Sequence, residues 1–324
     1  MVTKAIISNK YGSPDILEVN EVETPIPDDN QVLVKIHAAS LNYGNLVLLK
    51  GEPYLARFAF GILKPKYSIP GGDFAGRIES VGKNVNHFKP GDEVFGDLSG
   101  CGWGTFAEYV VVPEHVLVLK PSNLSFEEAA AVPMAATTAL QSLRNKGKIE
   151  SGQKVLINGA SGGVGTFAVQ IAKSFGAEVT GVCSTRNLNI LQSIGADFVI
   201  DYSKEDFTKT AQRYDLILAV NGYQPISAYK RALRPKGNYV MVGGSGAQLT
   251  QAMVLGPFFS MTGGKKMGSF LQRANQKDLV FIKELIEAGK VKPVIDRSYK
   301  LNEVPEAFRY FEEGHNQGKV VITM

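Results

Sequence analysis

Cysteine and histidine are scarce in this sequence. The 324 residues include two cysteines, Cys101 and Cys183, and four histidines, all far apart along the chain: His37, His87, His115 and His315. Two thiols cannot build a disulfide framework, and ligands this dispersed do not form the Cys and His clusters that hold structural zinc. We interpret each histidine as a structural or surface residue. The low cysteine content favours a reducing compartment, the cytoplasm.

Long basic runs and long apolar runs are also missing. The net charge is +4, and lysines and arginines are interspersed with acids, so the sequence lacks the basic stretches typical of nucleic-acid-binding proteins. No apolar run approaches the roughly 18 residues that a membrane-spanning helix needs, and the first residues lack the apolar core of a signal peptide. We therefore expect a globular cytoplasmic protein with neither a nucleic-acid partner nor a membrane span.

Two kinds of hydrophobic pattern are present instead. Residues 1–123 contain short alternating segments separated by turn residues, which predict an antiparallel, barrel-like β domain. In residues 124–270 a helix-like segment at 125–145 precedes alternating strand-like and helix-like segments, which predict a doubly wound parallel sheet. The tail, residues 271–324, contains two predicted helices and a strand, and we assign it to the first domain. The prediction is an α/β protein with two domains.

The stretch "LINGASGGVGTFAVQ", residues 156–170, places four glycines between a predicted strand and a predicted helix. It contains Ala160-x-Gly162-x-x-Gly165, the dinucleotide-binding fingerprint with alanine at its first position. Gly162 lets a pyrophosphate approach the backbone, Gly165 lets the helix pack closely on the sheet, and N–H groups at the helix start attract the anion. The alternative is a glycine-rich turn without a ligand. The predicted cofactor contacts here are Ala160, Ser161, Gly162, Gly163, Val164 and Gly165.

The end of the next strand indicates which dinucleotide binds. An Asp or Glu about 20 residues after the fingerprint would favour NAD by binding the ribose hydroxyls. The sequence there is "GVCSTRN", without an acid, and Ser184, Thr185, Arg186 and Asn187 offer hydroxyl, guanidinium and amide donors to a 2′-phosphate. We therefore predict NADPH in preference to NADH. The alternative for Arg186 is a solvated side chain at a helix start.

The order of several motifs resembles that of a known family. The stretches "HAASLNYGN", "GGDFAGRIESVGKNVNHFKPGDEVFG", "TFAEYVVVP", "AAAVPMAATTAL" and "INGASGGVGTFAVQIAK" follow one another as they do in the medium-chain dehydrogenase/reductase superfamily. The resemblance is to its zinc-free branch of quinone oxidoreductases and covers essentially the whole chain. It implies a GroES-like β-barrel domain, a Rossmann domain, and a homodimer paired through the sheet edge at "KKMGSFL", residues 265–271.

The resemblance also implies that this chain holds no zinc. Zinc-dependent relatives carry a cysteine where this chain has Asn42, a histidine where it has Gly72, and a cysteine near Met134. A catalytic zinc needs three protein ligands of the Cys, His or carboxylate type, and a structural zinc needs four. Neither set is present, so we predict no metal site. Asp73, beside one of these positions, is interpreted as a hydrogen-bonding residue in a turn.

Site residues are carried over from the family by position. Asn42 and Tyr43, in the turn that faces the nicotinamide in relatives, are the predicted catalytic residues; Asn42 orients the cofactor or a carbonyl group. Tyr43 either donates a proton or packs, since some relatives take the proton from water. Further predicted cofactor contacts are Thr138, Tyr202, Asn221, Gly222, Gly243, Gly244 and Lys319, where Lys319 aligns with a basic residue that reaches the pyrophosphate in zinc-dependent relatives. Each is equally open to a local structural role.

These features predict hydride transfer from NADPH to a quinone or an α,β-unsaturated carbonyl, because such acceptors need no strong Lewis acid. The aromatic segment 51–70 and the apolar segment 257–266 are expected to flank the acceptor pocket or simply to pack the protein. Residues 57–66 are also basic and apolar enough to touch a membrane surface. Two alternatives to this function stay open: a zinc-free alcohol or carbonyl oxidoreductase, and a non-catalytic sensor or scaffold that binds NADPH.

Overall fold

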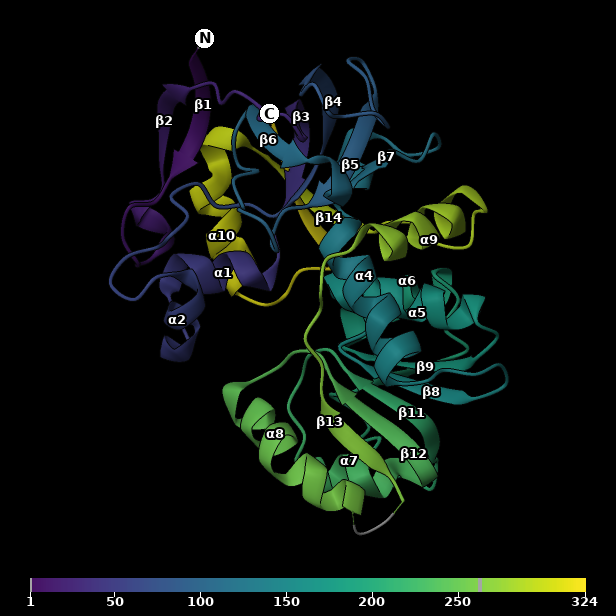
Figure 1. Cartoon of the computed structure of the whole chain (residues 1–324). Helices are drawn as coiled ribbons and strands as arrows, with labels where there is room; N and C mark the ends of the chain where they lie inside the picture. Colours follow the sequence, from purple (N-terminus) through teal and green to yellow (C-terminus); the bar gives the residue numbers. More distant parts are fainter. Residues whose placement is uncertain (1, 262–263) are drawn as a thin grey trace. The chain divides into compact units, whose positions relative to one another are not determined.

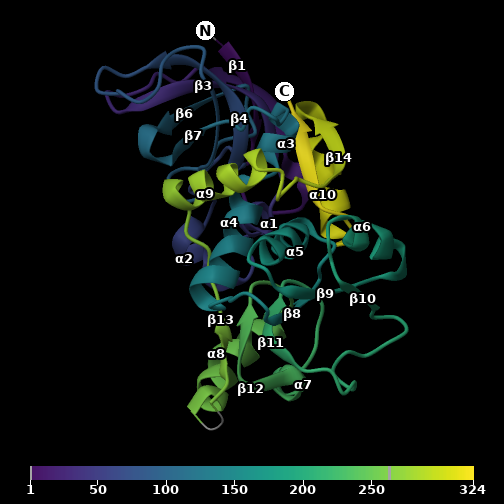
Figure 2. The same ribbon diagram turned by 90° about the vertical axis from the view of Figure 1, so that its right-hand side faces the viewer.

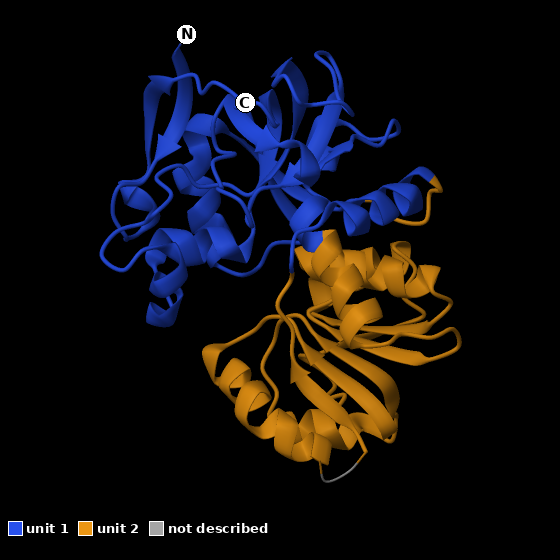
Figure 3. Ribbon diagram, in the orientation of Figure 1, with its two compact units in different colours: residues 1–135, 273–287, 293–324 blue, residues 136–272, 288–292 orange. Residues whose placement is uncertain are grey.

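The computed structural model describes residues 2–261 and 264–324, which fold into two compact units (Figure 3). Unit 1 comprises residues 1–135, 273–287 and 293–324, and unit 2 comprises residues 136–272 and 288–292. The first break falls after Ala135, later than the boundary drawn from the sequence at 123/124. The reason is that helix α3 (Phe126–Ala130) packs on strands β3 and β4 of unit 1.

Unit 1 is built on a seven-stranded sheet (Figure 1). Its order is β14, β15, β3, β4, β5, β7, with β6 also paired to β3, while β1 and β2 form a separate antiparallel pair. The strands are β1 (Val2–Ile7), β2 (Glu18–Glu23), β3 (Gln31–Ser40), β4 (Asp73–Val81), β5 (Glu93–Asp97), β6 (Tyr109–Pro113), β7 (Leu117–Leu119), β14 (Ile295–Lys300) and β15 (Lys319–Thr323). The helices are α1 (Tyr43–Lys50), α2 (Arg57–Phe60), α3, α9 (Gln276–Glu287) and α10 (Val304–Glu312). The antiparallel β domain is thus confirmed; β14 is additional, because its mostly polar sequence carries no alternating apolar pattern.

Unit 2 contains a six-stranded parallel sheet in the order β10, β9, β8, β11, β12, β13. Counted from β8, this is the 3-2-1-4-5-6 order of dinucleotide-binding folds, in which ligands bind where the order reverses, between β8 and β11. Figures 1 and 2 show α5 and α6 on one face of the sheet and α7 and α8 on the other. The elements are β8 (Lys154–Asn158), β9 (Glu178–Cys183), β10 (Phe198–Asp201), β11 (Tyr214–Ala219), β12 (Leu233–Met241), β13 (Lys266–Ser269), α5 (Gly163–Ser174), α6 (Leu188–Ser193), α7 (Ile226–Ala232) and α8 (Gly246–Met261).

The single helix predicted over 125–145 is interrupted. Helix α3 ends before Pro133, and α4 (Pro133–Gln141) begins with it, because proline has no backbone N–H and is tolerated only in the first turn of a helix. A second difference concerns the segment 257–266. It belongs to α8 as far as Met261, while residues 262 and 263 lie outside the described part of the chain.

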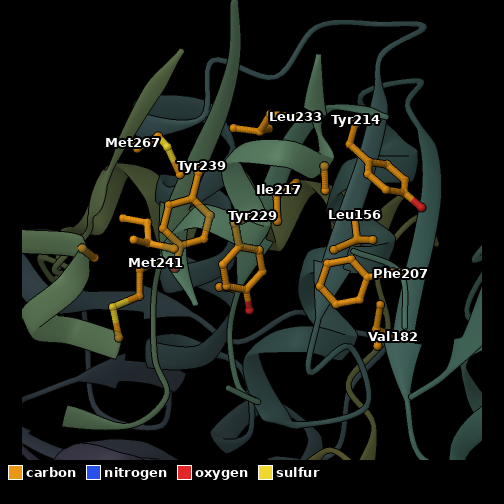
Figure 4. Packing of buried hydrophobic residues seen from close by; sticks show 14 residues of the cluster. Leu156, Val182, Phe207, Tyr214, Ile217, Tyr229, Leu233, Tyr239, Met241 and Met267 are labelled. Carbon is orange, nitrogen blue, oxygen red and sulfur yellow. The ribbon is translucent and has the colours of Figure 1, made fainter. Parts of the chain in front are cut away.

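The core of unit 2 fills the space between the sheet and helix α7 (Figure 4). Tyr229 and Tyr239 lie with their ring centroids 4.7 Å apart, and Phe207 packs on Tyr229 at 5.9 Å. The hydroxyl of Tyr229 accepts a hydrogen bond from Asn158 Nδ2 at 2.8 Å. Since Asn158 is the last residue of β8, this bond ties the core to the strand end from which the glycine loop starts.

Two strand registers in unit 1 bring distant residues together. Antiparallel β15 and β3 pair Val321 with Ser40, and continuing that register by two residues places Lys319 opposite Asn42. Strands β3 and β4 pair Ser40 with Asp73. The backbone pairing therefore gathers an amide, a carboxyl group and an amine at one end of this sheet.

Candidate functional site

The glycine loop of unit 2 has the geometry that its sequence predicts. A Cβ atom on Gly165 would lie 2.2 Å from the carbonyl oxygen of Gly159 and 2.6 Å from the carbonyl carbon of Ala160, so α5 packs directly on the turn. At Gly162, the residue before α5, the nearest atom would be 3.8 Å away. The loop thus combines close packing at Gly165 with open space at Gly162, the side on which a phosphate approaches helix N–H groups.

The turn after β9 is hydrogen-bonded to the glycine loop. It forms a short 3-10 turn, Thr185–Asn187, that starts after Ser184. The side chain of Asn187 donates from Nδ2 to Ser161 Oγ at 2.8 Å, and both residues are buried. Arg186, in the middle of the turn, is exposed. The structure therefore brings together two of the predicted cofactor-binding stretches, one after each of two adjacent strands.

An acid that the sequence analysis did not consider lies beside this turn. Asp201 is the last residue of β10 and pairs with Cys183 at the end of β9. Its carboxylate accepts hydrogen bonds from the hydroxyl groups of Thr185 and Ser203, which hold the pKa of Asp201 at about 2. The prediction from the sequence rests on the residues that directly follow β9, whereas parallel pairing supplies the acid from the next strand. Its oxygens are occupied by these internal hydrogen bonds.

The loop after β11 lies against the end of β8, and the loop after β12 lies against the end of β11. The backbone N–H of Asn221 donates to the carbonyl oxygen of Asn158 at 3.2 Å. A Cβ atom on Gly243 would lie 2.5 Å from the carbonyl oxygen of Val220, and Gly244 has a φ of +123°. The predicted residues Asn221, Gly243 and Gly244 thus follow neighbouring strands at the carboxyl edge of the sheet.

Two further predicted contacts in unit 2 differ in exposure. Thr138 is buried on α4, and Tyr202, which follows Asp201, is 63% exposed. The backbone N–H of Tyr202 donates to Cys183 O at 3.1 Å, which holds the tyrosine beside the end of β9. The cofactor roles of both residues stay predictions.

Unit 1 contains a buried polar centre that no local motif indicates. The Lys319 ammonium donates to Asn42 Oδ1 at 2.6 Å and to the carbonyl oxygen of Leu41 at 2.9 Å, and its Nζ lies 3.6 Å from Asp73 Oδ2. Asn42 Nδ2 donates to the same carboxylate oxygen of Asp73 at 2.8 Å. Lys319 is 2% exposed, Asp73 is fully buried and Asn42 is 7% exposed.

Asp73 has further partners within unit 1. Ser40 Oγ donates to its Oδ2 at 3.2 Å, and the backbone N–H of Met134, in the first turn of α4, donates to its Oδ1 at 3.0 Å. The carboxyl group therefore binds a helix start, where a negative charge is favourable. Asp73 is more than the turn residue suggested by the sequence: it connects β3, β4, β15 and α4.

Burial shifts the pKa values of both ionisable groups in this centre. Desolvation raises the pKa of Asp73 to about 7, against the lowering effect of the Lys319 charge, and the nearby Asp97 raises it further. Desolvation likewise lowers the pKa of Lys319, against the raising effect of Asp73. Both shifts follow from removing charges from water, and the attraction between the ammonium and the carboxylate opposes each shift and favours the ion pair.

The single tryptophan, Trp103, forms an apolar wall next to the polar centre. It has a φ of +60° and is 6% exposed, and its ring packs edge-on against Phe60 at 6.0 Å. A Cβ atom on Gly44 would lie 2.9 Å from Trp103 Cη2, and one on Gly72 would lie 3.4 Å from both Trp103 Cζ3 and Met134 Cε. Trp103 is not among the predicted site residues, although the glycines on either side of it signal an unusual backbone.

The two predicted catalytic residues differ in exposure. Asn42 directly precedes α1 and is buried, and its backbone N–H donates to Asn45 Oδ1 at 2.7 Å, which fixes the start of the helix. Tyr43, the first residue of α1, is 66% exposed. The structure therefore gives Asn42 a defined set of side-chain partners, while the proton-donor role of Tyr43 stays a prediction.

Comparisons with known proteins now identify the family. Residues 28–122 match the family model described as alcohol dehydrogenase GroES-like domain, and residues 194–322 match the one described as zinc-binding dehydrogenase. The chain is 38% identical to 2-methylene-furan-3-one reductase of Solanum lycopersicum, over 98% of this chain and 78% of that protein. It is 34% identical to the chloroplast envelope quinone oxidoreductase homolog of Arabidopsis thaliana, over 98% and 97% of the two chains. The chain belongs to the medium-chain dehydrogenase/reductase superfamily. Among solved structures, the quinone oxidoreductase of Coxiella burnetii matches with a TM-score of 0.88 and 30% identity over 100% of both chains.

Membership of the superfamily confirms several expectations. The protein is an NAD(P)H-dependent oxidoreductase of the quinone oxidoreductase-like type, with a GroES-like domain and a doubly wound nucleotide-binding sheet. The space at Gly162 and the close packing at Gly165 fit a nicotinamide dinucleotide at the start of α5. In the described part of the chain, no helix is long and apolar enough to cross a membrane.

The residues in unit 1 do not fit a catalytic zinc. The resemblance described above matches zinc ligands of zinc-dependent members to Asn42, to Gly72 and to a position near Met134, and these residues offer an amide, a hydrogen atom and a thioether. Lys319 brings an ammonium group to the same place, and a cation repels a metal ion. Within residues 2–261 and 264–324, no group of three or more His, Cys, Asp or Glu side chains is placed to hold a metal.

Proposed function

We propose that this protein transfers a hydride from NADPH to a quinone or to an α,β-unsaturated carbonyl compound without using zinc. The observation that carries the proposal is the Asn42 amide, held by Lys319 and Asp73 at the place where zinc-dependent relatives hold their metal. An amide N–H stabilises a partial negative charge by a hydrogen bond, which is weaker help than a Lewis acid gives. It suits acceptors whose own conjugation delocalises the incoming charge. The tomato and Arabidopsis relatives are named for such acceptors.

The reaction balances with one hydride and one proton. When bound, NADPH supplies the hydride, which forms a C–H bond at the β-carbon of an enone while the C=C electrons move toward the carbonyl oxygen. The Asn42 N–H donates to that oxygen as its charge grows. Tyr43, at the exposed start of α1, or a water molecule then delivers a proton to the α-carbon. The products are the saturated carbonyl compound and NADP⁺.

An apolar acceptor is supported by the segment between residues 51 and 70. Five of its large side chains are exposed, although side chains of these types are usually buried: Tyr54, Leu55, Phe58, Ile62 and Leu63. The guanidinium group of Arg57 lies over the rings of Tyr11 and Tyr54, at 4.5 and 4.8 Å from their centroids, and fixes the middle of the segment. We infer that this surface receives the hydrophobic part of the acceptor. Several large apolar side chains exposed within one short segment are typical of a binding surface.

The direct test is oxidation of the cofactor in the presence of candidate acceptors. Purified protein is mixed with NADPH or NADH and with quinones and enones of increasing chain length, and absorbance at 340 nm is followed before and after exhaustive chelation of metals. Turnover of one acceptor class, faster with NADPH and unchanged by chelation, supports the proposal. Oxidation of simple alcohols alone would favour a zinc-free alcohol oxidoreductase. Tight NADPH binding without turnover of any acceptor would favour a sensor or scaffold.

We further propose that Arg186 selects NADPH by binding its 2′-phosphate. Arg186 is exposed in the turn after β9, and Asn187 of the same turn is bonded to the glycine loop. Replacing Arg186 by alanine is expected to raise KM for NADPH about 10-fold or more while changing KM for NADH little, because a charge-assisted hydrogen bond to phosphate is lost. The matched control is Arg231→Ala, an exposed arginine on α7. Equal effects on both cofactors would remove Arg186 from this role.

We also propose a homodimer and a cytoplasmic location. Strand β13 lies at the edge of the parallel sheet, so its outer backbone groups can pair with a second copy. Light scattering is expected to give a mass near twice the 35.1 kDa of one chain, and a monomer would contradict the pairing. The cytoplasm is supported by the two cysteines, which are both free.

A further inference from the structure

The hydrogen bonds around Asn42 allow one orientation of its amide. Its Oδ1 faces the Lys319 ammonium, which can only donate, and its Nδ2 faces the Asp73 carboxylate, which accepts. Turning the amide by 180° would place N–H groups against the ammonium and an oxygen against the carboxylate. The charges of Lys319 and Asp73 therefore fix which end of the amide points where.

This arrangement leaves a defined hydrogen bond unused. An amide nitrogen carries two hydrogens, and the bond from Nδ2 to Asp73 uses one of them. In the described residues, Asn42 Nδ2 has no second side-chain or backbone acceptor. With Oδ1 held by Lys319, the group that Asn42 offers to a bound acceptor is an N–H, as a carbonyl oxygen requires.

Stability alone does not account for the ion pair. Taking both charges out of water costs about as much as their attraction returns, and a buried pair can often be replaced by apolar residues of similar size without loss. Lys319 and Asp73 come from β15 and β4, two separate strands, and meet at Asn42, the residue between β3 and α1. Because a buried ion pair adds little net stability, the contact of both Lys319 and Asp73 with one amide points to a role in holding that amide.

The position of Lys319 bears on two possible roles for this residue, binding of the cofactor pyrophosphate and orientation of the Asn42 amide. A lysine that binds the cofactor pyrophosphate needs an amine directed toward the ligand, whereas Lys319 is 2% exposed and donates to Leu41 O and Asn42 Oδ1. The two assignments predict different kinetic effects. Loss of a pyrophosphate contact weakens cofactor binding, while loss of amide orientation lowers the rate of the chemical step.

We propose that Lys319 and Asp73 are positioning residues that lock the Asn42 amide with its free N–H toward the carbonyl oxygen of the acceptor. The proposal rests on the proposed function for its effect on the reaction. Lys319 and Asp73 act through Asn42 and touch neither acceptor nor cofactor. The pair supplies orientation where zinc-dependent relatives supply a metal.

The test removes both charges together, so that neither is left buried alone. In the variant Lys319→Met with Asp73→Asn, kcat is expected to fall about 10²-fold, the effect of losing one preorganised donor, with little change in the NADPH dissociation constant. That constant is measured by quenching of the single tryptophan, Trp103. The matched control is Lys50→Met with Glu312→Gln, which removes a half-exposed ion pair of unit 1 and should leave both values unchanged.

Three kinetic outcomes are distinguishable. A fall in kcat with unchanged NADPH binding supports the positioning role. A weaker NADPH affinity with unchanged kcat assigns Lys319 to the pyrophosphate and overturns it. Unchanged values of both kcat and affinity also overturn it, because the pair would then be structural only.

A second measurement does not depend on turnover or on the variant's folding. In wild-type protein labelled with ¹⁵N-asparagine, the side-chain signal of Asn42 is assigned by its loss in Asn42→Ala. A locked amide is expected to give two widely separated proton shifts and slow hydrogen exchange. Signals like those of exposed asparagines would overturn the inference. If the wild type reduces no acceptor, the proposed function fails, and this spectrum, compared with that of the Lys319→Met, Asp73→Asn variant, still decides whether the pair locks the amide.

Discussion

Replacing Asn42 by alanine is expected to lower kcat for the acceptor by about 10²- to 10³-fold, because the one amide donor of the unit 1 centre is lost. NADPH affinity should change little, since the cofactor contacts proposed for the glycine loop are untouched. Stopped-flow measurement of the 340 nm absorbance gives the rate of hydride transfer, and Trp103 quenching gives the affinity. The control is Asn30→Ala, an exposed asparagine that bonds Asn84.

The same substitution tests whether Asn42, Lys319 and Asp73 depend on one another for stability and for catalysis. Alanine at position 42 removes one hydrogen-bond partner from each of the buried groups of Lys319 and Asp73, so we expect a loss of stability of about 1–3 kcal/mol, measured by thermal unfolding. Combining Asn42→Ala with the Lys319→Met, Asp73→Asn pair should lower kcat no further, because residues that act through one amide are not additive. A wild-type kcat in Asn42→Ala would remove Asn42 from the reaction, and additive losses in the combined variant would show that Lys319 and Asp73 do not act through Asn42.

The second large effect concerns the glycine loop. In Gly165→Ala the new Cβ would meet the backbone of Gly159 and Ala160 at 2.2 to 2.7 Å, so α5 has to move away from the turn. Overpacking of this kind costs about 1–3 kcal/mol, and the displaced helix start should also lose most of its NADPH affinity. Thermal unfolding and tryptophan quenching measure the two losses.

Gly162→Ala separates binding from folding. Its Cβ would meet nothing nearer than 3.8 Å, so the melting temperature is expected to stay unchanged while NADPH affinity falls about 10-fold or more, because the methyl group occupies the approach to the backbone. Gly246→Ala, at the open start of α8, is the control and should change neither value. Unimpaired NADPH binding in Gly162→Ala would show that the cofactor does not lie at this loop.

Local patterns in the sequence were sufficient for the glycine loop of the nucleotide-binding unit. A strand, a glycine-rich turn and a helix follow one another within residues 154–174, so the fingerprint and its packing are properties of adjacent residues. Tertiary structure was needed for Asp201, because only the parallel pairing of β9 with β10 places an acid beside Thr185.

Two helical regions differ from what their sequence pattern predicts. The period of residues 125–145 indicated one helix, and Pro133 divides it because the ring cannot occupy a helix interior. Helix α8 was missed because its apolar residues are distributed around the helix and show no amphipathic stripe.

By itself the sequence determined the superfamily, the glycine loop and the amide, hydrogen and thioether at Asn42, Gly72 and Met134. Only the tertiary structure decided what surrounds Asn42. The register of β15 against β3 brings in Lys319 from 277 residues away, and β4 supplies Asp73. No periodicity or spacing encodes such a contact, because antiparallel pairing joins strands regardless of their separation in the chain. The physical reason is the sequence separation of the interacting residues. A turn depends on neighbouring residues, while a buried ion pair depends on strands that the whole sheet brings together.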